Sequence, residues 1–245
     1  MIKLCYSDGI MEFPMRINKY LAHQGIASRR EADVLVEAGK VLINGKKAKN
    51  GDQVNESDKV EVKGATKSKT YLAYYKGRGI ITHSPSEREV DIKARLEKDY
   101  GITNVSPVGR LDKDSEGLII LSNDGRITGP LLDPESDHEK EYEVAVDKTI
   151  GLMFIKAMSN GVEIEGYRTK PARVSAHKTN QKHFTIVLTE GKKHQIRRMC
   201  AALGYQVQHL KRTRITNIKL DKLKPNQYRK ITGPELDGFL KELGM

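Results

Sequence analysis

Residues that build metal sites, disulfides and membrane spans are scarce in this sequence. Of the two cysteines, Cys5 lies near the start of the chain and Cys200 far along it, so they form no metal-ligand pair. The seven histidines show no His-x-x-x-His spacing, and no metal is predicted. Because the longest apolar runs are only a few residues and no secretory signal is visible, we expect no membrane partner and a cytoplasmic location.

Glycine-rich loops that cradle nucleotide phosphates are also missing, so the chain is expected to work without a cofactor. Positive charge, in contrast, is abundant. The formal net charge is +11, and the basic stretch at 192–230 contains twelve Lys or Arg and a single acid, Asp221. The remainder of the chain is close to neutral. Such a stretch predicts binding to phosphate and therefore to nucleic acid, while charge alone does not separate RNA from DNA.

The 245 residues are enough for two domains, each with its own core. Residues 1–14 show no clear periodicity and are expected to be an N-terminal extension. From 15 to 62 the pattern predicts two short helices and a small hairpin sheet. The second helix begins with a capping box of Ser28 and Glu31, and the Asn-Gly pair at 44–45 predicts the tight turn of the hairpin.

A linker is expected at 63–69, where the residues are small, polar and charged. From 70 to 245 strands and helices are mixed in an order that favours an α+β sheet domain. Strands are predicted at 71–75, 117–121, 140–146, 184–189 and 215–220. Helices are predicted at 90–99, 151–159, 194–203 and 234–243.

The most informative run, at 109–118, is Gly-Arg-Leu-Asp-Lys-Asp-Ser-Glu-Gly-Leu. It places the carboxylate of Asp112 in a glycine-flanked turn directly ahead of an apolar strand. Its acidic spacing also imitates the start of a calcium-binding loop, but the twelfth position, which needs a bidentate Glu, is Asn123. An ordinary polar turn would explain the two glycines but not the chemistry elsewhere in the chain.

Two other segments combine polar residues with an apolar row. At 137–142 the sequence Asp-His-Glu-Lys-Glu-Tyr opens a strand on which Tyr142, Val144 and Val146 share one face, so Tyr142 belongs to the apolar row. At 189–199 the sequence Thr-Glu-Gly-Lys-Lys-His-Gln-Ile-Arg-Arg-Met leads from a strand into a helix. The buried stripe of that helix is predicted to consist of Ile196, Met199, Cys200 and Leu203, with Arg197 at its border.

The run at 109–118 meets every fixed position of the catalytic signature of pseudouridine synthases, Gly-Arg-Leu-Asp-x-x-Ser-x-Gly-Leu, and the chain therefore resembles that family. The resemblance implies a mixed antiparallel-sheet catalytic domain and a cofactor-free isomerisation of uridine. Asp112 would be the carboxylate that serves as nucleophile or as base while the uracil is trapped in the pocket. Arg110 would help to displace the target base or would contact an RNA phosphate, two roles that stay equally open.

The same resemblance assigns roles in the two other segments. Tyr142 matches the aromatic residue of the family's Lys-x-Tyr motif, which stacks on the uracil and moves the C5 proton, and Lys140 of that motif is a candidate RNA contact. Arg197 matches the basic residue after Gln-Ile, whose implied role is to pair with Asp112, keep it ionised and hold one rotamer. The family's Asn-Lys-Pro-x-Gly loop is Tyr-Lys-Gly-Arg-Gly here, at 75–79, so its proline is missing.

Residues 15–62 resemble the S4 RNA-binding module, on the runs Arg-Ile-x-Lys-Tyr-Leu and Ser-Arg-Arg-Glu-Ala. Ile17 stands where this pattern commonly carries leucine. A generic small α+β fold is the alternative. The basic side chains expected to contact RNA are Arg29, Arg30 and Lys46 in this module and Lys192, Lys193, Arg198, Arg212 and Arg214 in the basic stretch.

S4-bearing members of the family modify ribosomal RNA, and residues 137–142 and 211–217 most resemble the branch of large-subunit synthase F. We therefore expect a monomeric enzyme that acts on 23S ribosomal RNA or its precursor. Alternatives are the same enzyme acting on 16S ribosomal RNA or tRNA, and a non-catalytic ribosome-assembly factor, which would have no use for Asp112, Tyr142 and Arg197 together. An aminoacyl-tRNA synthetase can also carry an S4 module, but it would need an ATP-binding signature that the chain lacks.

Overall fold

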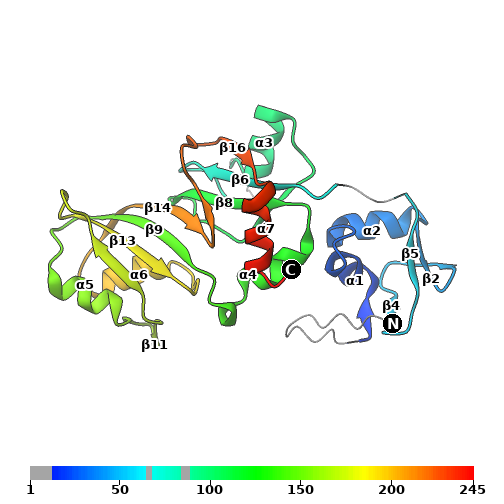
Figure 1. The fold of residues 1–245 in the computed structure, drawn as a ribbon, viewed down its shortest axis with the longest axis horizontal. Helices are drawn as coiled ribbons and strands as arrows, with labels where there is room; N and C mark the ends of the chain where they lie inside the picture. The colour runs from blue at the N-terminus through cyan, green and yellow to red at the C-terminus, as the bar shows by residue number, and fades with distance from the viewer. Residues whose placement is uncertain (1–12, 65–67, 84–88) are drawn as a thin grey trace.

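The computed structural model describes residues 13–64, 68–83 and 89–245. The extension expected at 1–14 lies outside these ranges except for its last two residues. Figure 1 shows a small N-terminal body beside a larger body that holds the rest of the chain. Within the described ranges, no helix is long and apolar enough to span a membrane. The same residues contain no group of three His, Cys, Asp or Glu side chains placed to hold a metal ion.

The small body packs two helices against short strands, around Ile17, Leu21 and Val36. Its elements are β1 (Met15–Arg16), α1 (Ile17–His23), α2 (Arg29–Glu37), β2 (Val41–Ile43), β3 (Lys46–Lys47), β4 (Gln53–Val54) and β5 (Val60–Val62). The predicted capping box is confirmed, because the Glu31 amide donates to Ser28 Oγ at 3.3 Å and the Ser28 amide donates to the Glu31 carboxylate at 3.0 Å. The predicted Asn-Gly turn joins β2 to β3.

The larger body is built on one nine-stranded sheet. Its strands are β6 (Tyr71–Lys76), β7 (Ser106–Val108), β8 (Glu116–Ser122), β9 (Lys140–Val146), β12 (Arg173–Ala176), β13 (His183–Leu188), β14 (Val207–Ile215), β15 (Ile218–Lys219) and β16 (Tyr228–Lys230). The order is β12-β13-β9-β14-β8-β6-β16, with β15 beside β14 and β7 beside β8. All pairings are antiparallel except that of β14 with β8, so the sheet is mixed and the α+β prediction is confirmed.

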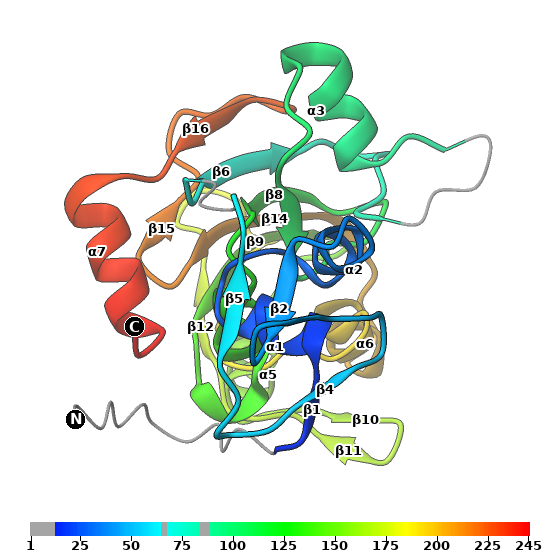
Figure 2. The ribbon, with the colours of Figure 1, turned by 90° about the vertical axis from the view of Figure 1, so that its right-hand side faces the viewer.

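Helices cover both faces of this sheet. The elements outside it are α3 (Ile92–Tyr100), η1 (Gly125–Ile127), α4 (Thr128–Leu132), η2 (Pro134–Ser136), α5 (Leu152–Ser159), β10 (Glu163–Ile164), β11 (Tyr167–Arg168), α6 (Gln195–Ala202) and α7 (Gly233–Glu242). Around β6 and β8, α7 packs on one face through Phe239 and α3 on the other through Ile92 and Leu96, on the two sides seen in Figure 2. Around β9 and β13, α5 and α6 complete a further cluster, and the predicted stripe of α6 faces it.

The strand expected at 215–220 is wrong. β14 ends at Ile215, Thr216 takes a left-handed φ of 49°, and only the two-residue β15 follows. The long strand lies earlier, where Val-Gln-His-Leu-Lys-Arg-Thr-Arg-Ile is mostly polar. Shifts of register within β14 also break the alternation of apolar and polar residues by which a strand is recognised in a sequence.

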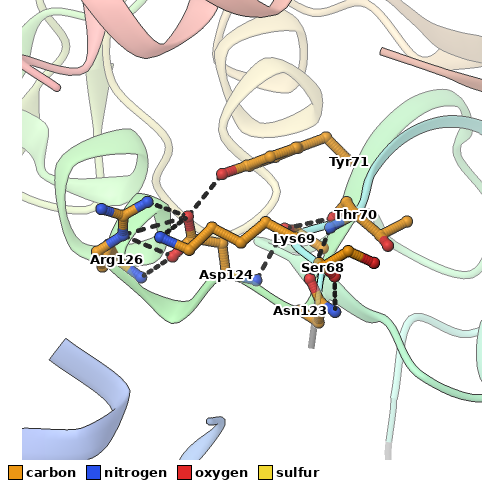
Figure 3. A network of polar contacts seen from close by, with 8 residues as sticks. Ser68, Lys69, Thr70, Tyr71, Asn123, Asp124 and Arg126 are labelled. Atoms are coloured by element: carbon orange, nitrogen blue, oxygen red, sulfur yellow. Dashed lines mark hydrogen bonds and ion pairs between the residues drawn. The ribbon is translucent and has the colours of Figure 1, made fainter. Parts of the chain in front are cut away.

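A network of polar contacts around Asp124 marks the junction between the two bodies (Figure 3). The Tyr71 hydroxyl and the Arg126 guanidinium each donate to Oδ2 of Asp124 at 2.6 Å, and the Lys69 ammonium lies 3.6 Å from the same oxygen. A Cβ added at Gly25, in the turn after α1, would lie 2.7 Å from Nε of Arg126. The small body therefore rests directly on this network.

Replacing Asp124 with asparagine is expected to lower the free energy of unfolding by about 2–3 kcal/mol at pH 7. Burial by itself would raise the pKa of Asp124, but hydrogen bonds from Arg126 and Tyr71 and nearby positive charge outweigh it and hold the pKa below its ordinary value. This stability is present above the ordinary carboxyl pKa of about 3.9 and is lost as the pH falls through the lower folded-state value. Urea denaturation should show this difference in the free energy of unfolding between wild type and Asp124→Asn at neutral pH. The difference should become smaller in acid.

Asp99→Asn provides the matched control for this prediction. Arg95 and Asp99 in α3 lie at the same N–O distance, 2.6 Å, as Arg126 and Asp124, but 25% of the Asp99 side chain is exposed whereas that of Asp124 is fully buried. A pair at the surface contributes about 0.5 kcal/mol. Equal losses in the two variants would contradict a junction stabilised by the buried Asp124.

Candidate active site

Asp112 lies in the turn between β7 and β8, at the end of the sheet, where the sequence placed it. The Ser115 amide donates to the carbonyl of Asp112 at 3.1 Å and closes the turn. The preceding residue, Leu111, is buried; its amide donates to Oγ1 of Thr82 at 3.1 Å, and the Thr82 hydroxyl donates back to its carbonyl at 2.8 Å. A side chain from a distant segment thus fixes the backbone that presents the carboxylate.

Lys76 holds the same turn from the end of β6. It is fully buried, and its ammonium donates to the carbonyls of Ile80 at 2.7 Å, Gly77 at 3.1 Å and Lys113 at 3.4 Å. Burial lowers the pKa of Lys76 to about 8, against the charge of Asp112, which acts to raise it. Lys76 therefore carries positive charge near Asp112 at neutral pH. These bonds also secure the loop in which the family's proline is missing.

Arg212 supports the turn and corrects one prediction. Only 7% of this residue is exposed, and its guanidinium donates to the carbonyls of Leu118 at 2.7 Å and Arg110 at 3.4 Å. The expected RNA contact does not agree with this position, because the side chain is occupied inside the fold. Gly117 lets β14 come this close to β8, since a Cβ there would lie 2.2 Å from the carbonyl oxygen of Arg212.

Arg197 and His194 approach the turn from the start of α6. One terminal nitrogen of Arg197 lies 3.3 Å from Oγ of Ser115 and 3.5 Å from the carbonyl of Asp114. Among the contacts of the described residues, Arg197 does not make the expected pair with Asp112. Instead, Nε2 of His194 lies 3.4 Å from Oδ1 of Asp112. Sequence reasoning missed His194, although it stands directly before the Gln-Ile pair that singled out Arg197.

Tyr142 and Lys140 lie on β9, one strand beyond β14. Tyr142 is opposite Arg212 in the ladder, and Arg212 is opposite Gly117, so the backbone of Tyr142 is two strands, about 10 Å, from the start of β8. Its side chain packs on the cluster of α5 and α6, which confirms the apolar row. Lys140 is half buried, and burial together with the charge of Arg212 lowers its pKa. In the described part of the chain, no hydrogen bond joins either side chain to Asp112.

Much of the positive charge predicted to face RNA is neutralised within the fold. Arg214 lies 3.0 Å from Glu139 and 3.3 Å from Glu141, and Arg198 pairs with Glu165. These acids lie many residues before the basic stretch. The composition of the stretch alone therefore did not predict that its arginines would be paired. The candidate RNA contacts whose side chains remain exposed are Arg29, Arg30, Lys46, Arg110, Lys192 and Lys193.

A carboxylate held at the edge of a mixed sheet, with a small helix-and-hairpin body beside it, is the arrangement expected of an RNA-directed enzyme with an attached RNA-binding module. Comparison with protein families makes this specific. The RNA pseudouridylate synthase model matches residues 70–202, and the S4 domain model matches residues 15–60. The chain belongs to the RNA pseudouridylate synthase family and carries an S4 domain ahead of its catalytic domain.

Individual relatives agree with this assignment. The dual-specificity RNA pseudouridine synthase RluF of Escherichia coli K12 is 42% identical over 236 residues, which cover 93% of this chain and 79% of that protein. The uncharacterized RNA pseudouridine synthase YtzG of Bacillus subtilis 168 is 37% identical over 91% of this chain and 97% of its own length. A crystal structure of a pseudouridylate synthase superimposes with a TM-score of 0.67 and 26% identity, over 94% of this chain and 99% of that one. The chain is accordingly a pseudouridine synthase.

Proposed function

We propose that this pseudouridine synthase modifies one uridine of 23S ribosomal RNA, or of its precursor, and acts as a monomer in the cytoplasm. The observation that carries the proposal is the carboxylate of Asp112, fixed in the family's signature turn of a chain that also has an S4 domain. The choice of the large subunit is supported by the resemblance of residues 137–142 and 211–217 to synthase F, and by the 42% identity to RluF. RluF is named a dual-specificity enzyme, so 16S ribosomal RNA and tRNA, the alternative substrates, must be tested as well.

The proposed division of labour follows the order of the chain. Residues 15–62 grip structured RNA through exposed basic side chains, residues 63–69 link the two parts, and residues 70–245 carry out the chemistry. Neutralising several phosphates with Lys and Arg makes such binding strongly dependent on salt. The S4 domain supplies affinity in this scheme, and the turn of Asp112 supplies the reaction.

In the proposed reaction the N1–C1′ bond of uridine breaks and a C5–C1′ bond forms, while C5 loses a proton and N1 gains one. No atom is added or removed, so the reaction consumes no cofactor. Asp112 acts as the nucleophile or as the base that opens the sequence of steps. Lys76 places positive charge near its carboxylate, and His194 offers its Nε2 to Oδ1. Arg197 contributes by anchoring the turn through Ser115.

The uridine base must leave its stack before it can react. This step costs about a few kcal/mol, and it costs least for a base that already lies in a loop or bulge. Arg110, which is exposed two residues before Asp112, either helps this displacement or contacts an RNA phosphate. Tyr142 then stacks on the uracil and moves the C5 proton. Lys140, Lys192 and Lys193 contact the RNA backbone around the site.

Pseudouridine mapping tests the substrate. RNA from cells that lack this enzyme is separated into 23S with its precursors, 16S and tRNA, and each fraction is incubated with the purified protein. We expect one new pseudouridine in the 23S fraction. A product in 16S or tRNA alone would overturn the large-subunit assignment while leaving the reaction intact. No product in any fraction, from a protein that still binds the RNA, would overturn the reaction itself.

A further inference from the structure

The contact between His194 and Asp112 has no part in the roles assigned by family resemblance. Nε2 of His194 lies 3.4 Å from Oδ1 of Asp112, and both side chains are partly exposed, at 48% and 39%. Among the described residues, His194 is the one basic side chain within 4 Å of this carboxylate. The distance is longer than a direct hydrogen bond, but contacts in an empty active site are often long and tighten only around the substrate.

The backbone at His194 is unusual for a histidine. Its φ of 52° and ψ of 27° are left-handed, a conformation that is unfavourable for a residue with a Cβ and natural for glycine. Non-glycine residues in such conformations persist where the surroundings impose them, and they are concentrated at functional sites. The carbonyl of His194 accepts a hydrogen bond from the amide of Arg198, and this bond begins the helical pattern of α6. His194 therefore lies directly before the helix, with its side chain toward the turn of Asp112.

A buried carboxylate constrains the segment next to His194. Glu190 is 2% exposed and accepts from the side-chain amide of Gln195 at 2.6 Å and from the amide of Lys170 at 3.0 Å. The Tyr167 hydroxyl is bonded to the same carboxylate. Gln195 in turn accepts from the amide of Lys192 at 2.9 Å. The segment that carries His194 is therefore clamped at both ends, and the imidazole is delivered to Asp112 by a rigid turn.

We propose that His194 is a positioning residue whose Nε2 holds one oxygen of the Asp112 carboxylate, so that the other oxygen is aimed at the uridine. The inference rests on the proposed role of Asp112. A carboxylate that is 39% exposed has room to rotate, and a donor fixed by a clamped turn restricts it to one orientation. Arg197 does not hold the Asp112 carboxylate in this structure, because its guanidinium donates hydrogen bonds to Ser115 and to the carbonyl of Asp114 instead.

The test compares His194→Gly with His194→Gln in the full-length protein. Glycine removes the imidazole and suits the left-handed backbone, so the variant should be at least as stable as wild type. The side-chain amide of glutamine still reaches and donates to the carboxylate. At saturating RNA, we expect the single-turnover rate to fall about 10- to 100-fold in His194→Gly and less in His194→Gln, with the Kd for RNA within twofold of wild type.

Asp221→Gly serves as the control, because Asp221 is also a left-handed non-glycine residue, with φ 49°, and lies outside the site. It should leave the single-turnover rate at saturating RNA unchanged. An unchanged rate in His194→Gly would overturn the inference, and so would equal losses in the two His194 variants. A weaker Kd with a normal rate at saturation would overturn it in favour of an RNA contact.

Asp112→Asn, measured alongside, separates this inference from the proposed function. If Asp112→Asn stays active, the role of Asp112 fails, and the positioning role falls with it. If Asp112→Asn is inactive while His194→Gly reacts at the wild-type rate, only the positioning role fails. Loss in both, with tight RNA binding preserved, is the expected result.

Discussion

Asp112→Asn is expected to reduce the rate of pseudouridine formation by about 10⁴-fold or more, the order seen when an enzyme loses an essential nucleophile or base. Asparagine has the same shape but neither a negative charge nor a free pair of carboxylate oxygens. The turn itself should survive, because Thr82 and Lys76 hold it through the backbone of Leu111 and Lys113. Release of tritium from uridine labelled at C5 measures the rate directly.

Asp114→Asn is the control for this loss. Asp114 lies two residues further along the same turn, and its side chain is exposed. The substitution removes the same charge from the same loop and should change the rate by only a few-fold. RNA binding and the thermal midpoint should be close to wild type in both variants. Comparable rates for the two would mean that Asp112 contributes charge to the turn and no chemistry.

Gly117→Ala is expected to destabilise the protein by at least about 3 kcal/mol, the cost of a clash that a packed core cannot absorb. A Cβ at this position would lie 2.2 Å from the carbonyl oxygen and 2.6 Å from the amide nitrogen of Arg212, both of them backbone atoms. The φ of 111° adds strain for any residue other than glycine. Relief would require β8 and β14 to separate, at the point where Arg212 supports the turn of Asp112. Chemical denaturation measures the loss.

Gly166→Ala is the control for this prediction, because it introduces backbone strain without a clash. The difference between the two variants gives the part of the effect that comes from the clash. Gly166, between β10 and β11, has a φ of 76° with no atom within 4 Å of an added Cβ. The left-handed conformation alone costs about 1–2 kcal/mol for alanine. A loss in Gly117→Ala no larger than that in Gly166→Ala would show that the two strands can part without cost.

The features that could be predicted from the sequence are those governed by neighbours along the chain. The capping box of Ser28 and Glu31, the apolar row that begins at Tyr142 and the buried stripe of α6 depend on residues within a few positions of one another. The position of Asp112 at a strand end follows from a turn and a strand that are adjacent in the sequence. All of these expectations agree with the structure.

The features that could not be predicted depend on strands brought together by the sheet. Arg212 looks like an exposed cation in a basic run, and only its pairing with β8 places its guanidinium on the carbonyl of Leu118. Arg214 is likewise neutralised by acids of β9. The contact of His194 with Asp112 joins residues more than 80 positions apart, and its one local sign, a left-handed backbone at a histidine, is invisible in the sequence.

β8 follows the turn of Asp112 at one end and leads to the junction with the S4 domain at the other. Its seven residues span about 20 Å, and β6 pairs with it from Gly117 to Ser122. Because β8 is paired along most of its length, it fixes the separation between the junction at Asp124 and the carboxylate of Asp112. In the proposed scheme, an RNA that is gripped by the S4 domain must present its uridine at the distance that this separation allows. We therefore expect target choice to depend on this distance as well as on the bases around the uridine.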